Sequence, residues 1–378
     1  MSDKIWLSSP HMGGNELKYI HEAFDENWVA PLGPNVNGFE EDLERFLNED
    51  VKVAALSAGT AALHLALIEC GVGYGDEVIC QSMTFSASAN PIAYQGALPV
   101  FIDSEEDTWN MCPKALRTAI EDRIKLGNKP KAIIFVHLYG MPAKMDEIIA
   151  IANEFDIPVI EDAAEALGSS YNGQSCGTFG RFGVLSFNGN KIITTSGGGA
   201  LVCHTTEDKD KAVFLSTQAR DNAPHYQHSH IGYNYRMSNI CAGIGRGQME
   251  VLKDRVAARR AMTAFYIDFF ADIEGVEVLS EPNDKFYSNH WLSAILIDPE
   301  KTGVTREDLR LALLEDNIES RPLWKPMHLQ PVFKKAPYYG EHVAEKLFEK
   351  GLCLPSGSNL TEEEKQRIQT AISKVFSK

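Results

Sequence analysis

Residues 157–199 read IPVIEDAAEALGSSYNGQSCGTFGRFGVLSFNGNKIITTSGGG, and this stretch decides the fold. Its start, Ile157–Glu161, has the pattern of a buried strand, and Asp162 follows directly. A carboxylate at that place costs several kcal/mol unless it meets a cation or a strong donor. Asp162 is therefore either a capping residue or the partner of a buried positive group. Lys191 precedes three glycines, and is either a solvated loop lysine or a desolvated lysine that can form a Schiff base.

Outward from this stretch, short apolar runs alternate with helical patterns over the first 240 or so residues. Strands that are apolar on both faces and separated by helices favour a parallel sheet covered on two sides. The sequence therefore predicts an α/β domain. The expected strands are Val51–Leu56, Asp76–Cys80, Leu98–Ile102, Lys131–Leu138 and Ile157–Glu161, and the expected helices are Ala61–Glu69 and Lys144–Glu154.

The pattern changes near residue 245. We expect one long helix over Gln248–Ile273, a strand over Trp291–Ile297, and helices near Thr305–Asp316 and Thr361–Phe376. This predicts a large domain of residues 1–245, which includes the N-terminal segment, and a smaller α+β domain of residues 246–378. Ligand sites favour such junctions and the carboxyl ends of parallel strands.

Composition and charge exclude several classes of protein. The chain has 378 residues, 44% of them hydrophobic, and a formal net charge of −16. Such an acidic surface disfavours nucleic acid and anionic membranes as partners. The seven cysteines are scattered without a CxxC pair, and the N-terminus lacks a signal-peptide pattern, so we expect a cytoplasmic protein with reduced thiols. His225, His228 and His230 have metal-like spacing without a carboxylate partner, and we expect no metal.

Two further motifs follow expected strands. Ser57-Ala58-Gly59-Thr60-Ala61 precedes a helix, where Gly59 would allow close backbone approach and the helix start would attract an anion. The alternative is an ordinary capped helix start, with Thr60 as the cap. Phe85 follows the expected strand Asp76–Cys80, and is either a core aromatic or a ring that stacks on a planar ligand.

Taken together, these features match the needs of pyridoxal phosphate: a lysine, a carboxylate for the ring nitrogen, a helix start for the phosphate and an aromatic ring. With the motifs EDAAEALGSSYNGQSCGTFGRFGVLSFNGNKIITTSGGGAL and GYNYRMSN, the sequence resembles the DegT/DnrJ/EryC1/StrS sugar aminotransferases over nearly its whole length. The resemblance implies a fold-type I aminotransferase, with a large, mostly parallel sheet flanked by helices and a smaller C-terminal α+β domain.

The resemblance also implies roles for single residues. Lys191 would form the Schiff base with the cofactor, Asp162 would pair with the pyridinium nitrogen, and Phe85 would stack on the ring. Glu165 stands where many relatives have Gln or His, and would contact the ring hydroxyl.

The phosphate of the cofactor would be held by Gly59, Thr60 and Ser186. Asn234, in GYNYRMSN, would reach the phosphate in the neighbouring subunit. The resemblance therefore implies a homodimer with shared active sites.

Within the family, the segments 7–20, 27–40, 216–222 and 321–328 resemble the 4-aminotransferases that act on UDP-4-keto-6-deoxy-N-acetylglucosamine in bacillosamine biosynthesis. This implies glutamate as the amino donor and C4 of the keto-sugar as the acceptor, in the making of a bacterial glycan or polysaccharide precursor. Another keto-sugar nucleotide, GDP- or dTDP-linked or a 3-keto sugar, is the alternative.

Basic and polar residues in these segments are candidates for sugar-nucleotide binding. The segment RPLWKPMH is either a site that recognises the sugar or its diphosphate, or a structural turn with Trp324 buried. The candidate substrate-binding residues are Asn27, Trp28, Asn190, Arg321, Lys325 and His328.

Three other functions are alternatives to this one. Dehydratases of the family carry His where this chain has Lys191, which argues against that activity. A non-catalytic binding or regulatory protein of the same fold would not need all four cofactor groups. A nicotinamide enzyme would place GxGxxG between a strand and a helix, and the glycines of Gly243–Gly247 do not stand in that context.

Overall fold

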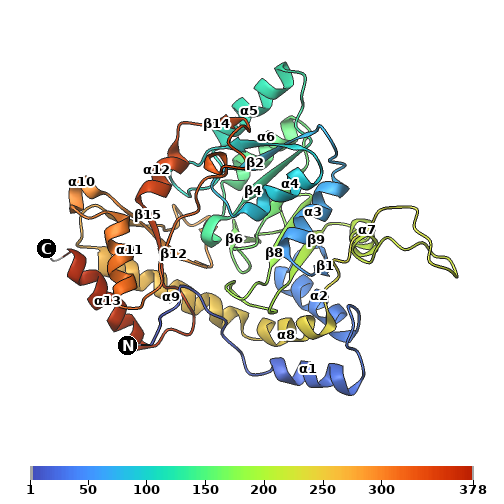
Figure 1. Ribbon diagram of the computed structural model, residues 1–378, viewed down its shortest axis with the longest axis horizontal. Coiled ribbons are helices and arrows are strands. Elements are labelled where there is room, and N and C mark those ends of the chain that lie inside the picture. The colour runs from blue at the N-terminus through green and yellow to red at the C-terminus, as the bar shows by residue number, and fades with distance from the viewer. Residues whose placement is uncertain (1–2, 377–378) are drawn as a thin grey trace.

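Short apolar runs build the central sheet of the structure, a computed structural model that describes residues 3–376. This sheet has eight strands in the order β1-β9-β8-β5-β4-β2-β3-β14 (Figure 1). The strands are β1 (Lys52–Leu56), β2 (Glu77–Gln81), β3 (Leu98–Ile102), β4 (Ala132–Val136), β5 (Val159–Asp162), β8 (Phe182–Ser186), β9 (Gly199–Cys203) and β14 (Tyr338–Tyr339).

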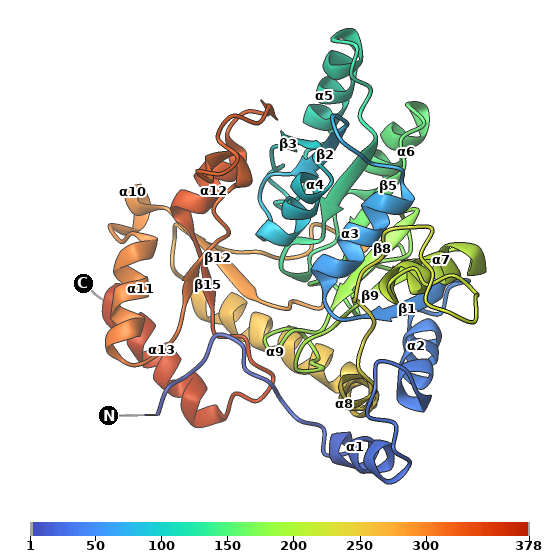
Figure 2. The ribbon, with the colours of Figure 1, turned by 45° about the vertical axis from the view of Figure 1, so that its right-hand side comes forward.

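Successive residues of these strands are buried on opposite faces of the sheet, as the apolar runs predict. Ile79 and Ile133 pack into one core, and Cys80 and Ile134 pack into another. One face is covered by α3 (Gly59–Glu69), α4 (Asn90–Tyr94) and α7 (Thr206–Ser216), as Figure 2 shows for α3 and α4. The other face is covered by α2 (Pro34–Leu47), α5 (Pro113–Lys125), α6 (Met145–Glu154) and α8 (Asn239–Met249).

The predicted parallel sheet is confirmed, with one exception. The neighbouring pairs from β14 through β3, β2, β4 and β5 to β8 are parallel. Strand β9 is antiparallel to both β1 and β8. Its sequence GALVC is buried along its whole length, as the parallel strands β2, β4 and β5 are, so hydrophobicity alone does not reveal its direction.

A second lobe follows α8. Its antiparallel sheet has the order β10-β12-β15-β13, and it packs on α9, α11 and α13. The strands are β10 (Val276–Val278), β12 (Ser293–Ile297), β13 (Arg321–Pro322) and β15 (Gly351–Leu354), and the helices are α9 (Leu252–Phe270), α10 (Pro299–Thr302), α11 (Arg306–Glu315), α12 (Val343–Lys350) and α13 (Glu362–Phe376). The remaining elements are α1 (Glu16–Asp25) and a three-stranded sheet of β6 (Ser170–Tyr171), β7 (Gln174–Ser175) and β11 (Phe286–Tyr287).

The prediction of one helix over Gln248–Ile273 is wrong at its start. Helix α8 ends at Met249 and α9 begins at Leu252, because the backbone at Val251 leaves the helical region (φ −113°, ψ 5°). Gln248 stays with α8, where its side chain accepts a hydrogen bond from the backbone N–H of Thr194. The apolar rhythm continues across the break, which is why the sequence reads as one helix.

The N-terminal segment lies against the C-terminal lobe before the chain enters α1 (Figure 2). Ile5 pairs with Ile318 and is buried in the core of that lobe, and Leu7 O accepts a hydrogen bond from Ser356 N at 2.8 Å. The predicted boundary at residues 245–246 falls within α8, and the division into two domains stays a prediction. Among residues 3–376, no helix has the length and apolar character that crossing a membrane requires.

Candidate active site

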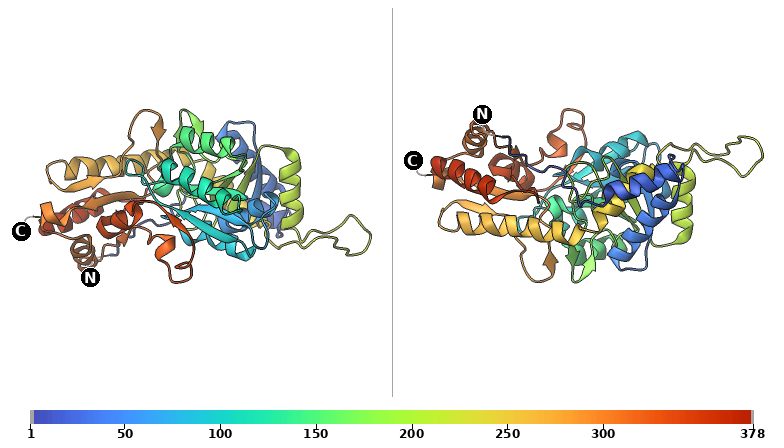
Figure 3. Two further views of the ribbon diagram at one scale, coloured as in Figure 1. Left: turned by 90° about the horizontal axis from the view of Figure 1, so that it is seen from above. Right: turned by 90° about the horizontal axis from the view of Figure 1, so that it is seen from below.

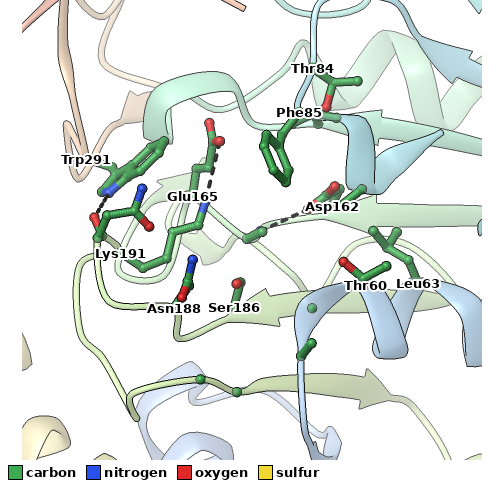
Figure 4. A pocket seen from close by; sticks show the side chains of 18 of the residues that line it. Thr60, Leu63, Thr84, Phe85, Asp162, Glu165, Ser186, Asn188, Lys191 and Trp291 are labelled. Atoms are coloured by element: carbon green, nitrogen blue, oxygen red, sulfur yellow. Dashed lines mark hydrogen bonds and ion pairs between the residues drawn. The ribbon is translucent and has the colours of Figure 1, made fainter. Parts of the chain in front are cut away.

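A cavity of about 340 Å³ lies where the carboxyl ends of β4, β5 and β8 meet the start of α3. Trp291 and Trp324 of the C-terminal part of the chain line its other side. Figure 4 shows its side chains converging from these elements. The predicted residues that line it are Gly59, Thr60, Phe85, Asp162, Glu165, Ser186, Asn190 and Lys191.

Asp162 is the last residue of β5 and is 4% exposed. Its carboxylate accepts hydrogen bonds from Ser88 Oγ at 2.6 Å and from Ala164 N at 3.1 Å. Burial raises the pKa of Asp162, while the Ser88 hydroxyl opposes that rise. Among residues 3–376, no cation lies within ion-pair distance of this carboxylate. A buried acceptor in this state suits a cationic nitrogen placed in the cavity.

Lys191 enters the cavity from the turn after β8, and its surroundings are a carboxylate and an indole. Its Nζ lies 3.5 Å from Glu165 Oε1 and 4.0 Å from the centre of the Trp291 ring. The Trp291 Nε1–H donates to the carbonyl of Asn190, the residue before Lys191, at 2.7 Å. Lys191 is thus mostly buried, in contrast to the alternative of a solvated loop lysine.

Glu165 is buried beside Lys191. Burial raises its pKa, and the charge of Lys191 and the backbone N–H of Tyr139 oppose that rise. That N–H donates to Glu165 Oε2 at 2.7 Å, so the two carboxylate oxygens have separate partners. Glu165 can therefore hold the lysine amine at a defined place in the cavity wall.

The start of α3 provides backbone donors without a side-chain cap. The helix is capped by Ala58, which offers no side-chain acceptor, so the alternative that Thr60 caps it is wrong. A Cβ at Gly59 would lie 3.1 Å from Ser186 Cβ, and a Cβ at Gly199 would lie 2.3 Å from Gly59 N. These glycines let β8, β9 and the helix start approach each other, which forms a cradle suited to an anion.

Phe85 is not a core aromatic. Its side chain is 53% exposed, it lines the cavity, and its ring centre lies 5.4 Å from that of Trp324. The exposed face of the ring is available to a planar ligand.

Most predicted substrate residues lie outside this cavity. His328 is held by its own chain, with Nδ1 2.6 Å from Ser82 Oγ and Nε2 3.1 Å from Glu345 Oε1. Trp324, from the same segment, lines the cavity instead. The exposed predicted residues that do not line it are Asn27, Trp28, Asn234, Arg321 and Lys325. Arg321 pairs with Glu319 at 2.8 Å, and the binding roles of all these residues stay predictions.

Sequence reasoning missed three residues that shape the site. Ser88 binds Asp162, Trp291 faces Lys191, and Tyr139 holds Glu165. Tyr139 is buried with a positive φ of 55°, and its hydroxyl accepts a hydrogen bond from Trp324 N at 2.9 Å. No motif marks these positions, although Ser88 lies only three residues after Phe85.

The histidines weighed as metal ligands lie on an exposed segment, where His228 Nδ1 contacts the carbonyl of Gln218 at 2.9 Å. Within the described residues, metal-like spacing is found instead at His137, Glu161 and Cys176. There the Ala143 N–H donates to His137 Nδ1 at 3.0 Å, and His137 Nε2 donates to Glu161 at 2.7 Å. His137 and Glu161 thus belong to a buried hydrogen-bond network, in which Glu161 also accepts from the backbone N–H of Phe179 at 2.8 Å.

The cavity fits pyridoxal phosphate on its own chemistry. An unpaired buried carboxylate, Asp162, suits the ring nitrogen, Lys191 supplies the amine, and the uncapped start of α3 suits the phosphate. Phe85 offers a ring face above them.

Comparisons with known proteins identify the family of the chain. Residues 10–373 match the model of the DegT/DnrJ/EryC1/StrS aminotransferase family. A Bacillus subtilis relative, named as the pyridoxal phosphate-dependent aminotransferase EpsN, is 52% identical over 380 residues, covering 100% of this chain and 97% of its own. GDP-perosamine synthase of Escherichia coli O157:H7 is 38% identical over 373 residues, 99% of both chains. A family aminotransferase structure from Brucella abortus has a TM-score of 0.89 at 32% identity, covering 96% of both chains.

Proposed function

The chain belongs to the DegT/DnrJ/EryC1/StrS aminotransferase family and is a pyridoxal phosphate-dependent sugar aminotransferase, and we propose that it transfers the amino group of glutamate to C4 of a nucleotide-linked 4-keto-6-deoxy sugar. The observation that supports this proposal is the presence of both Lys191 and Asp162 in one cavity beside the uncapped start of α3.

Pyridoxal phosphate supplies the electron sink that such an amino transfer requires. Lys191 would hold the cofactor through its amine, and the free amine would serve as the acid and base that moves a proton at the reacting carbon of the substrate. Asp162, held by Ser88 and Ala164, keeps the ring nitrogen protonated. Trp291 and Glu165 keep the lysine amine at the cavity wall when it is free.

The proposed acceptor is UDP-4-keto-6-deoxy-N-acetylglucosamine. The segments 7–20, 27–40, 216–222 and 321–328 support it by their resemblance to bacillosamine aminotransferases. A GDP-linked sugar is the second candidate, because GDP-perosamine synthase is similar to this chain over 99% of both lengths. In either case the sugar would meet Phe85 and Trp324, two aromatic side chains that line the cavity with ring centres 5.4 Å apart.

A direct test is to incubate the purified protein with glutamate and a panel of keto-sugar nucleotides, and to identify the products by mass spectrometry and NMR. The matched control is Lys191→Ala. We expect the 4-amino product from the UDP-linked sugar and a much slower reaction with the GDP-linked one. The reverse order would replace the UDP proposal with the GDP one. If no member of the panel is aminated, the proposal that the acceptor is a keto-sugar nucleotide is wrong.

We further propose a homodimer with shared sites. After α7, an arm of residues 218–233 extends far from the body of the chain (Figures 1 and 3). Ile231 on this arm is 85% exposed, and Asn234 lies at its base, bonded to Gln218 Nε2 at 3.1 Å. The exposed Tyr226 and Ile231 on this otherwise polar arm suit burial against a second copy, where Asn234 would reach the cofactor phosphate.

A further inference from the structure

Arg259 of α9 is a buried cation without an acidic partner. Its side chain is 1% exposed, and within residues 3–376 no carboxylate lies within ion-pair distance of it. Its Nε has no hydrogen-bond partner. Burial, together with the nearby charge of Arg255, lowers the pKa of Arg259 to about 9. Burying such a group costs free energy, so its position calls for a reason other than stability.

The two terminal nitrogens of Arg259 bind two different parts of the chain. Nη1 donates to the backbone carbonyl of Trp291 at 2.7 Å, and Nη2 donates to Ser8 Oγ at 2.8 Å. Only a planar fork of donors can hold both acceptors in one geometry. The guanidinium thereby joins the N-terminal segment to the start of β12.

Both of these partners converge on one atom, the carbonyl oxygen of Asn190. Ser8 Oγ–H donates to it at 2.7 Å, and Trp291 Nε1–H donates to it at 2.7 Å. Asn190 immediately precedes Lys191, and the Trp291 ring also faces Lys191 Nζ at 4.0 Å. Figure 4 shows Trp291 bound at this position above the lysine.

We propose that Arg259 is a positioning residue that fixes the Lys191 turn through Ser8 and Trp291. By holding both donors of the Asn190 carbonyl, it sets the path of the backbone into Lys191 and the place of the indole against the amine. Arg259 is not among the residues that line the cavity. This inference rests on the proposed role of Lys191. It adds that hydrogen bonds outside the cavity wall set the reactivity of that amine.

Arg255 provides a matched control. It lies one helical turn before Arg259, and its Nη2 donates to the backbone carbonyls of His11 at 3.3 Å and Met12 at 3.0 Å. It therefore also ties the N-terminal segment to α9, but among residues 3–376 it makes no hydrogen bond to Ser8, Trp291 or Asn190. A general loosening of the N-terminal segment would follow from losing either arginine.

The test measures how fast Lys191 reacts with pyridoxal phosphate in the full chain purified without cofactor. The aldehyde condenses with the amine and releases water, and borohydride then reduces the C=N bond, which leaves a stable mark that peptide mass mapping locates. Exposed lysines of the same sample serve as the internal reference. We expect Arg259→Gln to slow marking of Lys191 about tenfold, because small displacements of a reacting group have large kinetic effects.

Single-contact variants keep the test valid if Arg259→Gln does not fold. Ser8→Ala and Trp291→Phe each remove one donor to the Asn190 carbonyl, and we expect marking at Lys191 to slow about threefold in each. Arg259→Lys, which can reach only one acceptor, should restore part of the rate. Arg255→Gln should mark Lys191 at the wild-type rate.

Unchanged marking of Lys191 in a folded Arg259→Gln, or in Ser8→Ala and Trp291→Phe if the first does not fold, would overturn the proposal. Equal slowing in Arg255→Gln would overturn it as well. If Lys191 of the wild-type chain is not marked faster than exposed lysines, the proposed role of Lys191 fails instead. The two failures are therefore distinguishable.

Discussion

Asp162 combines full burial with hydrogen bonds from only Ser88 Oγ and Ala164 N among the described residues. These donors favour the ionised carboxylate, while burial raises the pKa of Asp162 and favours the neutral form. A protonated ring nitrogen in the cavity would settle this balance in favour of the ionised form. We therefore expect Asp162 to contribute little to folding and much to the charge state of the bound cofactor.

Asp162→Asn should separate these two contributions. The amide keeps the shape and can still accept from Ser88, but it lacks the negative charge. We expect the turnover number for glutamate to fall about 100-fold or more. The free energy of unfolding of the cofactor-free protein should stay the same or rise, because a buried charge is removed. A variant with near-native turnover would contradict the role of Asp162.

Glu69, at the end of α3, is a buried carboxyl, and neither of its oxygens has a hydrogen-bond partner within residues 3–376. Burial raises its pKa from 4.5 to about 7, and Lys211 opposes that rise. The folded protein thus binds more protons than the unfolded one between these two values. Its free energy of unfolding should fall as pH rises through this range. Above the range, Glu69 should cause no further change in that free energy with pH.

Glu69→Gln should therefore stabilise the protein at pH 8 by roughly 1–3 kcal/mol, and the gain should shrink toward pH 5. Urea unfolding at both pH values measures it. Glu77→Gln is the matched control, because Glu77 is buried but accepts from Arg123 Nε at 2.8 Å, and its loss should destabilise at pH 8. A pH-independent effect of Glu69→Gln would refute this account.

The sequence identified single site residues only where their type was unusual for the place. Asp162 after a buried strand and Lys191 before three glycines stand out, and the cavity contains both. Ser88 and Trp291 do not stand out, because a serine in a loop and a tryptophan at a strand start have many ordinary uses. Their importance arises from contacts across 74 and 101 residues of chain, which local patterns do not encode.

At the level of elements, the cradle depends on how closely β9 approaches the start of α3. A Cβ on Gly199 would lie 2.3 Å from both Ala58 C and Gly59 N, so Gly199→Ala must displace the helix start. We expect a loss of about 1–3 kcal/mol in the free energy of unfolding and weaker binding of pyridoxal phosphate. Calorimetry and a cofactor titration measure the two effects.

Gly197→Ala is the control for that substitution. A Cβ on Gly197 meets no atom within 4 Å, so the free energy of unfolding should be nearly unchanged. If both alanine variants bind the cofactor as the wild type does, the helix start is not the phosphate cradle.

Elements were predictable where hydrophobic pattern and length agree. Strand β3 has the predicted bounds of Leu98–Ile102, and α6 begins one residue after the predicted Lys144. The direction of β9 and the break between α8 and α9 were not predictable. The first depends on which neighbours the strand meets, and the second on a backbone change at Val251 that leaves the apolar rhythm intact.

At the level of the whole molecule, the proposed dimer predicts that two inactive chains can restore activity to each other. Lys191→Ala and Asn234→Ala should each lose most activity. In a mixed dimer, one site would combine the intact Lys191 of one chain with the intact Asn234 of its partner. We expect a mixture refolded or exchanged to equilibrium to recover about a quarter of wild-type activity.

The outcome that would contradict shared sites is a mixture no more active than the average of its two components. The molecular mass of wild type in solution is the accompanying measurement. A monomer at assay concentration with full activity would also exclude the shared arrangement.

The net charge of −16 remains compatible with phosphorylated ligands. It excludes binding to extended polyanionic partners. The cavity nevertheless provides local positive potential through Lys191 and the start of α3. The net charge describes the surface as a whole, and the folded structure is needed to locate regions of positive potential.

The most direct test of the central claim follows the labelled nitrogen of glutamate into the keto-sugar nucleotide, with wild type and Lys191→Ala compared at equal protein concentration. The account predicts that the wild-type chain moves the label to the sugar and that Lys191→Ala, folded and mixed with pyridoxal phosphate, does not. Transfer of the label by Lys191→Ala at near the wild-type rate would contradict it.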